Sequence, residues 1–194
     1  MRPLRLALTG VFCTALLTAS CSVPARAGVV STPAMSGVRD GQHDFDFELG
    51  HWKIHLKRRV HPLSGSQQWA VLDGTTTTRK VWNGRANLEE FEVRGPTGPI
   101  EGMTLRLYNP QTRQWSLYWA NSKAGVLGGP PNVGEFRNGV GEFYCYDTYN
   151  GRYVLIRYVW SRITPDSAHF EESFSDDGGR SWEVEWITDQ TRSR

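Results

Sequence analysis

The amino-acid sequence predicts an all-β protein, a single antiparallel up-and-down β-barrel of about ten strands. From residue 44 onward, short runs rich in Trp, Tyr, Phe, Val and Thr alternate with Gly, Pro, Asn and Asp, which is typical of successive strands and turns. No segment has a sustained helical period of apolar residues. Because hairpin turns follow one another, an open sheet would leave two unpaired edges, and closure into a barrel removes them.

The first 27 residues have the three parts of a secretory signal peptide. Arg2 and Arg5 supply a positive start, an apolar run covers 6–19, and Ala-Arg-Ala at 25–27 fits a cleavage site. The apolar run is shorter than the roughly 20 residues of a membrane-spanning helix, and no second such run follows. The sequence therefore predicts a periplasmic or secreted protein without an integral membrane span.

A second processing route is possible in the same region. Residues 17–21, Leu-Thr-Ala-Ser-Cys, loosely resemble a lipobox, in which Cys21 would become a lipidated first residue. Thr18 occupies a position where that pattern prefers a larger aliphatic side chain, so cleavage after Ala27 is favoured. Both routes lead out of the cytoplasm.

Removal of the signal peptide changes the charge of the protein. Residues 1–27 contain three arginines and no acidic residue, which leaves 19 basic and 20 acidic residues in the mature chain. A mature protein with a formal charge of −1 lacks the basic excess of a nucleic-acid-binding domain. We therefore expect no nucleic-acid partner.

The rest of the chain divides into a flexible leader and one domain. Residues 28–42 are small and polar, which predicts the leader, and the barrel domain is expected to cover 43–194. Eleven candidate strands follow from the aromatic and β-branched runs between turns: 51–60, 67–73, 75–83, 87–94, 102–109, 114–121, 132–137, 140–148, 152–161, 167–175 and 181–190.

Turn residues and alternation support this order of strands. Asn138-Gly139 and Asn150-Gly151 suit two-residue hairpin turns, because both positions of such a turn need a positive φ. Trp115, Leu117 and Trp119 share one face of their strand. Many strands have two moderately polar or aromatic faces, which fits a barrel around a lined cavity and also fits a flattened sandwich as the second architecture.

The segment Gly50-His51-Trp52, at the start of the first expected strand, resembles the G-x-W signature of lipocalins and the wider calycin group. In that group the Trp closes one end of the barrel and an Arg after the last strand packs across it. The resemblance implies that Trp52 and Arg192 form a structural end-plug here.

Nearly the whole mature chain resembles a set of uncharacterised bacterial lipocalin-like proteins that are described as domains of unknown function. The segments that carry the resemblance are 44–47, 50–52, 104–108, 115–120 and 174–179. It implies a calycin-type barrel and brings no substrate with it.

Candidate ligand-binding residues are those expected to line the barrel. Ligand pockets are mainly apolar and aromatic, with a few placed polar groups. Glu172 shares its face with Phe170 and Phe174, and a buried carboxylate needs a partner, for which Arg157 and Arg106 are candidates. Such a pair could fix strand register or anchor a polar head group. The full set is Trp82, Arg106, Tyr108, Tyr118, Trp119, Glu142, Tyr144, Arg157 and Glu172.

The sequence contains no nucleophile elbow, phosphate-binding glycine loop or metal-spaced Cys/His set, so no catalytic residue, metal or cofactor is predicted. His51 and His55 lie on one strand face about 13 Å apart and cannot share a metal by themselves. The favoured function is binding of a small, partly apolar ligand. The alternatives are a barrel-based isomerase, cyclase or hydrolase that uses Glu172 or Glu142, and a non-catalytic envelope protein with a packed interior. The sequence leaves the oligomeric state open.

Overall fold

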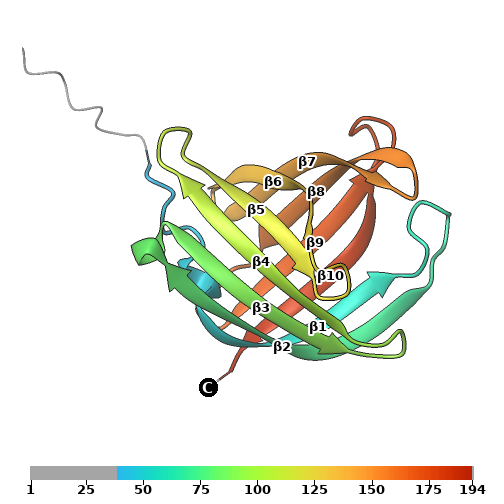
Figure 1. The fold of residues 1–194 in the computed structure, drawn as a ribbon, viewed down its shortest axis with the longest axis horizontal. Coiled ribbons are helices and arrows are strands. Elements are labelled where there is room, and N and C mark those ends of the chain that lie inside the picture. The colour runs from blue at the N-terminus through green and yellow to red at the C-terminus, as the bar shows by residue number, and fades with distance from the viewer. Residues whose placement is uncertain (1–38, 194) are drawn as a thin grey trace, which may run out of the picture. The chain divides into compact units, whose positions relative to one another are not determined.

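The computed structural model describes residues 39–193, which form a closed barrel of antiparallel strands (Figure 1). The predicted signal peptide, and the leader up to residue 38, lie outside the described residues. Two short 3-10 helices accompany the barrel, η1 (Asp46–Glu48) and η2 (Trp82–Gly84). The strands are β1 (Gly50–Arg59), β2 (Trp69–Val81), β3 (Ala86–Arg94), β4 (Ile100–Asn109), β5 (Gln114–Asn121), β6 (Leu127–Arg137), β7 (Val140–Tyr149), β8 (Arg152–Ser161), β9 (Ser167–Ser175) and β10 (Glu183–Arg192).

Each strand pairs with the next along the chain, and β1 pairs with β10 to close the barrel. This closing register runs from Trp52 opposite Arg192 to Arg58 opposite Trp186. The predicted ten-stranded up-and-down barrel is confirmed, and the flattened sandwich is wrong because the first and last strands are hydrogen-bonded to each other. Within 39–193, no helix has the length and apolar character of a membrane span.

The expected strands 67–73 and 75–83 are in fact one strand, β2. Gly74, which lies between the two expected strands, pairs with Val93 inside the β2–β3 ladder. A Cβ atom at this position would lie only 1.9 Å from the carbonyl oxygen of Glu92. The glycine therefore allows a close approach of two backbones and does not end the strand.

Both predicted two-residue hairpins are present. Asn138 and Gly139, with φ of 51° and 79°, join β6 to β7. Asn150 and Gly151, with φ of 49° and 78°, join β7 to β8. These turns place β6, β7 and β8 side by side, as the hairpin argument requires.

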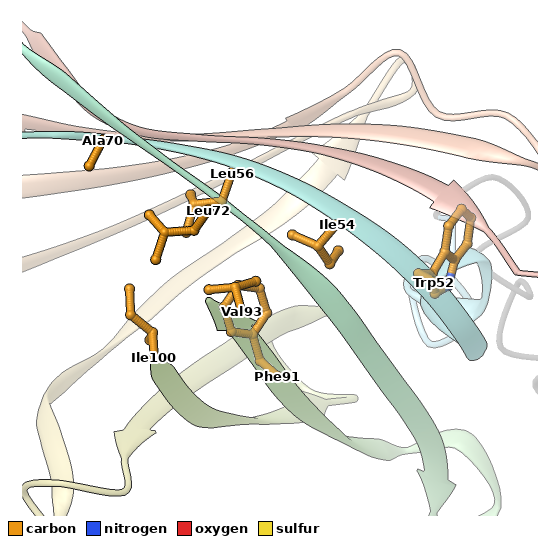
Figure 2. Packing of buried hydrophobic residues seen from close by; sticks show 8 residues of the cluster. All are labelled: Trp52, Ile54, Leu56, Ala70, Leu72, Phe91, Val93 and Ile100. Atoms are coloured by element: carbon orange, nitrogen blue, oxygen red, sulfur yellow. The ribbon is translucent and has the colours of Figure 1, made fainter. Parts of the chain in front are cut away.

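Alternation along the strands fills one side of the barrel interior with apolar side chains. Figure 2 shows this cluster, in which side chains from neighbouring strands point toward one another. Its members come from β1 to β4 and are all buried: Trp52, Ile54, Leu56, Ala70, Leu72, Phe91, Val93 and Ile100. The intervening residues His51, Lys53, His55 and Lys57 are exposed, which is the period-two pattern of a strand with one face in the core.

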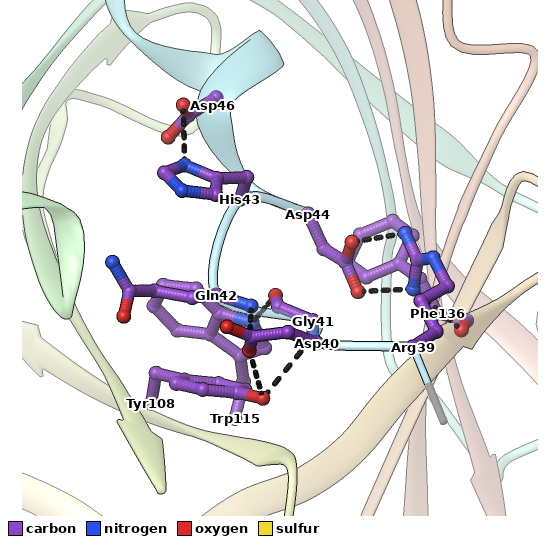
Figure 3. A network of polar contacts seen from close by, with 10 residues as sticks. All are labelled: Arg39, Asp40, Gly41, Gln42, His43, Asp44, Asp46, Tyr108, Trp115 and Phe136. Atoms are coloured by element: carbon purple, nitrogen blue, oxygen red, sulfur yellow. Dashed lines mark hydrogen bonds and ion pairs between the residues drawn. The ribbon is translucent and has the colours of Figure 1, made fainter. Parts of the chain in front are cut away.

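The segment before β1 closes one end of the barrel (Figure 3). Trp115 Nε1 donates a hydrogen bond to the Gly41 carbonyl oxygen (2.9 Å), and the Gly41 amide donates to the Tyr108 hydroxyl (3.1 Å). Tyr108 in turn donates to Asp40 (2.7 Å), and Arg39 pairs with Asp44. Residues 39–42 thus contact the barrel end, next to the expected start of the domain at residue 43.

Residues 40–49, which we call the plug, are held at this end by aromatic packing and by Arg192. The ring of Phe45 lies among four rings of the barrel strands, with centroid distances of 4.9 Å to Phe136 and 5.3 Å to Trp160. The Arg192 guanidinium lies 4.1 Å from the centre of the Trp52 ring. It also donates to the carbonyl oxygens of Leu49 and Phe47, at 2.8 and 2.9 Å. The contact that the G-x-W resemblance implies is therefore present.

Candidate ligand-binding cavity

The barrel encloses a cavity of about 270 Å³ between the plug and the opposite rim. Arg106, Trp160 and Gln190 line its inner part, near the plug, while Arg58 and Tyr149 line it at the rim. Its volume is just under the roughly 300 Å³ at which ligand pockets usually begin. A ligand of this cavity must therefore be small.

Aromatic side chains make up eight of the seventeen residues that line the cavity. Phe91 contacts Trp119 and Trp186, with ring centroids 5.9 Å apart in both pairs. Tyr158 and Phe170 lie edge to face at 5.3 Å on the opposite side of the interior. These rings come from strands β3, β5, β8, β9 and β10, so they surround the space and present apolar faces to it.

The first polar group of the cavity is a buried ion pair between Arg106 of β4 and Glu89 of β3. Arg106 Nη2 donates to Glu89 Oε2 at 2.6 Å, and Nη1 donates to Asn87 Oδ1 at 3.1 Å. The Thr76 hydroxyl donates to the other Glu89 oxygen at 2.9 Å. Both charges are buried, and this network compensates their desolvation.

The second polar group is a pair of carboxyls, Glu172 of β9 and Glu185 of β10, which lie within hydrogen-bonding reach of each other. Burial raises the pKa of Glu172 well above its usual range, and the negative charge of Glu185 raises it further. Burial also raises the pKa of Glu185, while the hydrogen bond from Glu172 and the charge of Arg58 oppose that rise. Both directions favour a proton on Glu172, where it is placed to donate to Glu185.

A fourth acidic residue, Glu48 in η1, is fully buried behind the inner end of the cavity. Trp160 Nε1 donates to Glu48 Oε1 at 2.8 Å, and Gln190 Nε2 donates to the same oxygen at 3.4 Å. Burial raises the pKa of Glu48 from its ordinary value of 4.5 to about 7, against the opposing charge of Arg106. Glu48 therefore changes protonation state close to neutral pH.

We predict that Glu48 makes the protein less stable as the pH rises from 5 to 8. A carboxyl whose pKa is raised by folding stabilises the folded state below its unfolded pKa, and this stability is lost as the pH passes the folded pKa. Urea unfolding should show that the wild type loses about 2–3 kcal/mol more over this range than Glu48→Gln does. Equal losses in the two proteins would contradict the assignment, because Glu172 and Glu185 contribute to both.

Of the nine ligand-binding residues predicted from the sequence, the cavity brings together Arg106, Trp119 and Glu172. Tyr108 is buried, but it binds the plug through Asp40 and Gly41 and does not line the cavity. The predicted partnership of Arg106 with Glu172 is replaced by the pair of Arg106 with Glu89.

The other five predicted residues lie away from the cavity. Tyr118 alternates with Trp119 and so lies on the outer face of β5, and Trp82 is 65% exposed in η2. Glu142 and Tyr144 share the outer face of β7, where the tyrosine hydroxyl donates to the carboxylate at 3.1 Å. The fifth residue is Arg157, which does not line the cavity either.

The expected ion pair between Arg157 and Glu172 is wrong. In the β8–β9 register, Tyr158 lies opposite Glu172, while Arg157 lies opposite Ser173 and points outward. The Arg157 guanidinium stacks 4.3 Å from the centre of the Trp182 ring. Both faces of β8 are largely apolar, so alternation alone gave no reason to place Tyr158 inside and Arg157 outside.

Sequence reasoning missed three acidic residues in or next to the cavity. Glu89 shares a strand face with Phe91 and Val93, and that alternation was an available signal. Glu185 reaches the cavity together with its neighbour Trp186 because the ladder shifts register between Val184 and Trp186. Neither that irregularity nor the burial of Glu48 in the plug has a local sequence signal.

Solved structures of other proteins resemble the chain. The S-type phycobiliprotein lyase CPES from Guillardia theta is 13% identical, with a TM-score of 0.55 over 80% of this chain and 94% of that chain. Rv2717c from M. tuberculosis is also 13% identical, with a TM-score of 0.56 over 81% of this chain and 100% of that chain. No protein-family model and no curated protein matches the chain.

Fold and comparisons together define the class of this protein as a calycin-like ten-stranded barrel. At 13% identity the likeness concerns the fold and not the ligand. The resemblance to uncharacterised bacterial lipocalin-like proteins stays a prediction, because it goes beyond the fold.

Proposed function

We propose that the protein is an exported barrel that binds a small, partly apolar ligand in its interior cavity. The observation that carries this proposal is the cavity itself, in which aromatic side chains and a pair of carboxyls, Glu172 and Glu185, line the same space. A barrel that served only as a packed envelope protein would gain stability by filling this space, since empty interior volume costs free energy. Retention of about 270 Å³ beside buried polar groups favours a ligand.

The carboxyl pair also favours a second candidate, an enzyme that performs acid–base chemistry on the bound molecule. The raised pKa of Glu172 suits a proton donor, and Glu185 beside it suits an acceptor. This retains Glu172 from the sequence prediction and removes Glu142, which lies on the outer surface. A bound compound that changes mass during incubation would favour the enzyme over the carrier.

Native mass spectrometry of the protein purified from its own host tests the proposed function. We expect one reproducible additional mass of a small molecule on the folded chain. The same spectrum reports processing, since a chain starting at Gly28 and a chain lipidated at Cys21 differ in mass. A chain without any additional mass after gentle purification would contradict the carrier proposal.

We predict that Thr104→Phe removes the ligand. Thr104 of β4 is buried and lines the cavity, so a phenyl ring at this position occupies the space. The ligand-bound fraction should fall at least about tenfold. Leu105→Phe adds a similar ring to the outer face of the same strand and should keep the ligand. Urea unfolding of both variants shows that the barrel is intact, and equal ligand retention in them would place the ligand elsewhere.

A further inference from the structure

We infer that the ligand is a small organic cation, an amine whose ammonium group lies between Glu172, Glu185 and the aromatic wall. The inference rests on the proposed function and names its ligand class. It follows from three features of the cavity: its charges, its rings and an acceptor without a partner.

Acidic side chains outnumber basic ones in the lining of the cavity. Three carboxyls, Glu89, Glu172 and Glu185, face two guanidinium groups. Arg106 is already engaged by Glu89 at 2.6 Å, so Arg58 is the lining guanidinium left for the other two carboxyls, and Arg59 acts on Glu185 from outside the lining. Arg58 is exposed at the rim, where water weakens its attraction to them. A ligand cation would supply the missing positive charge inside the cavity and take the place of a proton on the pair.

The aromatic wall fits a cation as well as an apolar body. Trp and Tyr rings attract an ammonium group placed over their faces, and the attraction grows when water is excluded. Trp186 already lies 5.8 Å from the Arg58 guanidinium, measured from the ring centre. Tyr158 lies opposite Glu172 in the β8–β9 register, so a ring adjoins the carboxyl pair. An ammonium group at the pair would therefore contact both charge and ring faces.

Gln190 provides an independent sign of a ligand. Its side chain is 6% exposed and lines the cavity, and its Oε1 accepts no hydrogen bond from any residue within 39–193. A buried acceptor of this kind is costly unless a ligand or a water molecule donates to it. Arg106 Nε also lacks a partner among these residues and suits a hydroxyl or ether oxygen on the same ligand.

An anionic ligand fits this cavity poorly, because it would meet Glu89, Glu172 and Glu185 with Arg106 already neutralised. A neutral ligand would instead accept a hydrogen bond from the protonated carboxyl of Glu172.

The pH dependence of the affinity separates a cationic ligand from a neutral one. The groups that face Glu172 are Glu185 from β10, Tyr158 from β8, Cys145 from β7 and Arg58 from β1. As the pH rises, the pair loses its proton, so affinity should rise for a cation and fall for a neutral ligand that needs the proton.

Three probes of one size and different charge test the inference: benzylammonium, benzyl alcohol and benzoate. Isothermal titration of the ligand-free protein should give the tightest binding for benzylammonium, at least about tenfold tighter than for benzyl alcohol. Benzoate should bind most weakly. Repeating the titration in buffers of different ionisation enthalpy should show proton release when benzylammonium binds, and its affinity should rise with pH.

Two variants should move the affinity for benzylammonium in opposite directions. Glu172→Gln keeps the shape of the side chain, prevents it from ionising when the cation binds and should weaken binding about tenfold. Arg58→Gln removes the competing cation at the rim and should strengthen binding by a factor of about 2–5. Glu142→Gln, on the outer face, is the matched control and should leave the affinity unchanged.

The outcomes distinguish this inference from the proposed function. Equal or tighter binding of benzyl alcohol or benzoate, or an unchanged affinity in Glu172→Gln, would overturn the cation assignment and leave a ligand-binding barrel in place. Absence of binding by all three probes would also overturn it. The host-derived mass decides the proposed function separately, and a bound anion in that spectrum would contradict the cation class alone.

Discussion

Replacing Arg106 with methionine should destabilise the protein by about 3–5 kcal/mol, because it leaves Glu89 buried without its partner. Arg106 Nη2 lies 2.6 Å from the Glu89 carboxylate, and its guanidinium also lies 5.0 Å from the centre of the Phe45 ring. Loss of Arg106 further removes the charge that opposes the raised pKa of Glu48. Urea unfolding at pH 7 measures the change in the free energy of unfolding.

The control for Arg106→Met is Arg137→Met, which removes the exposed pair of Arg137 with Glu135 on β6. A surface pair contributes only about 0–1 kcal/mol, so this variant should unfold close to the wild type. The double variant Arg106→Met, Glu89→Met should be less destabilised than Arg106→Met alone, since it removes the orphaned charge. A double variant as unstable as the single one would show that packing, and not charge, accounts for the loss.

Replacing Phe45 with alanine should cost about 3–5 kcal/mol, the usual range for a fully buried phenylalanine. Phe45 is the part of the plug that enters the barrel, and its ring meets those of Trp115, Phe136, Phe143 and Trp160. The other buried side chain of the plug is the acidic Glu48, so no apolar plug residue can fill the space that Phe45 leaves. Thermal and urea unfolding should both report the loss.

Phe47→Ala is the matched control for Phe45→Ala, because Phe47 belongs to the same plug and is only partly buried. Its ring lies 6.0 Å from those of Phe45 and Phe136, so its removal should cost clearly less. Equal costs would mean that the plug is stabilised as a unit by its hydrogen bonds and not by the insertion of Phe45. A near-zero cost for Phe45→Ala would mean that the barrel end closes without the plug.

These two predictions concern the structure that supports the proposed site. Arg106 touches the Phe45 ring of the plug on one side and Glu89 on the other, and it lines the cavity between them. Glu48 of the plug receives hydrogen bonds from Trp160 and Gln190, which also line the cavity. Closure of the barrel end and the polarity of the cavity therefore depend on the same residues.

The sequence by itself determined the class of fold and the order of the strands. Asn-Gly pairs at 138–139 and 150–151 specify two-residue hairpins, because both residues of such a turn need a positive φ. This requirement is local and depends on no distant contact. In β1, Trp52, Ile54 and Leu56 alternate with charged or polar residues, so the sequence pattern alone predicts which face of the strand is buried. Local chemistry of this kind is visible in a single chain.

Only the tertiary structure decided which side chains meet inside the barrel. On β8 both faces are apolar, so the choice between Arg157 and Tyr158 depends on how β8 pairs with β7 and β9. On β10 a register shift in the ladder brings Glu185 beside Glu172. The plug places Glu48 against Gln190, which is 142 residues away in the sequence. These neighbours are separated by most of the chain, and a contact between distant segments is set by register and closure, which local sequence patterns do not encode.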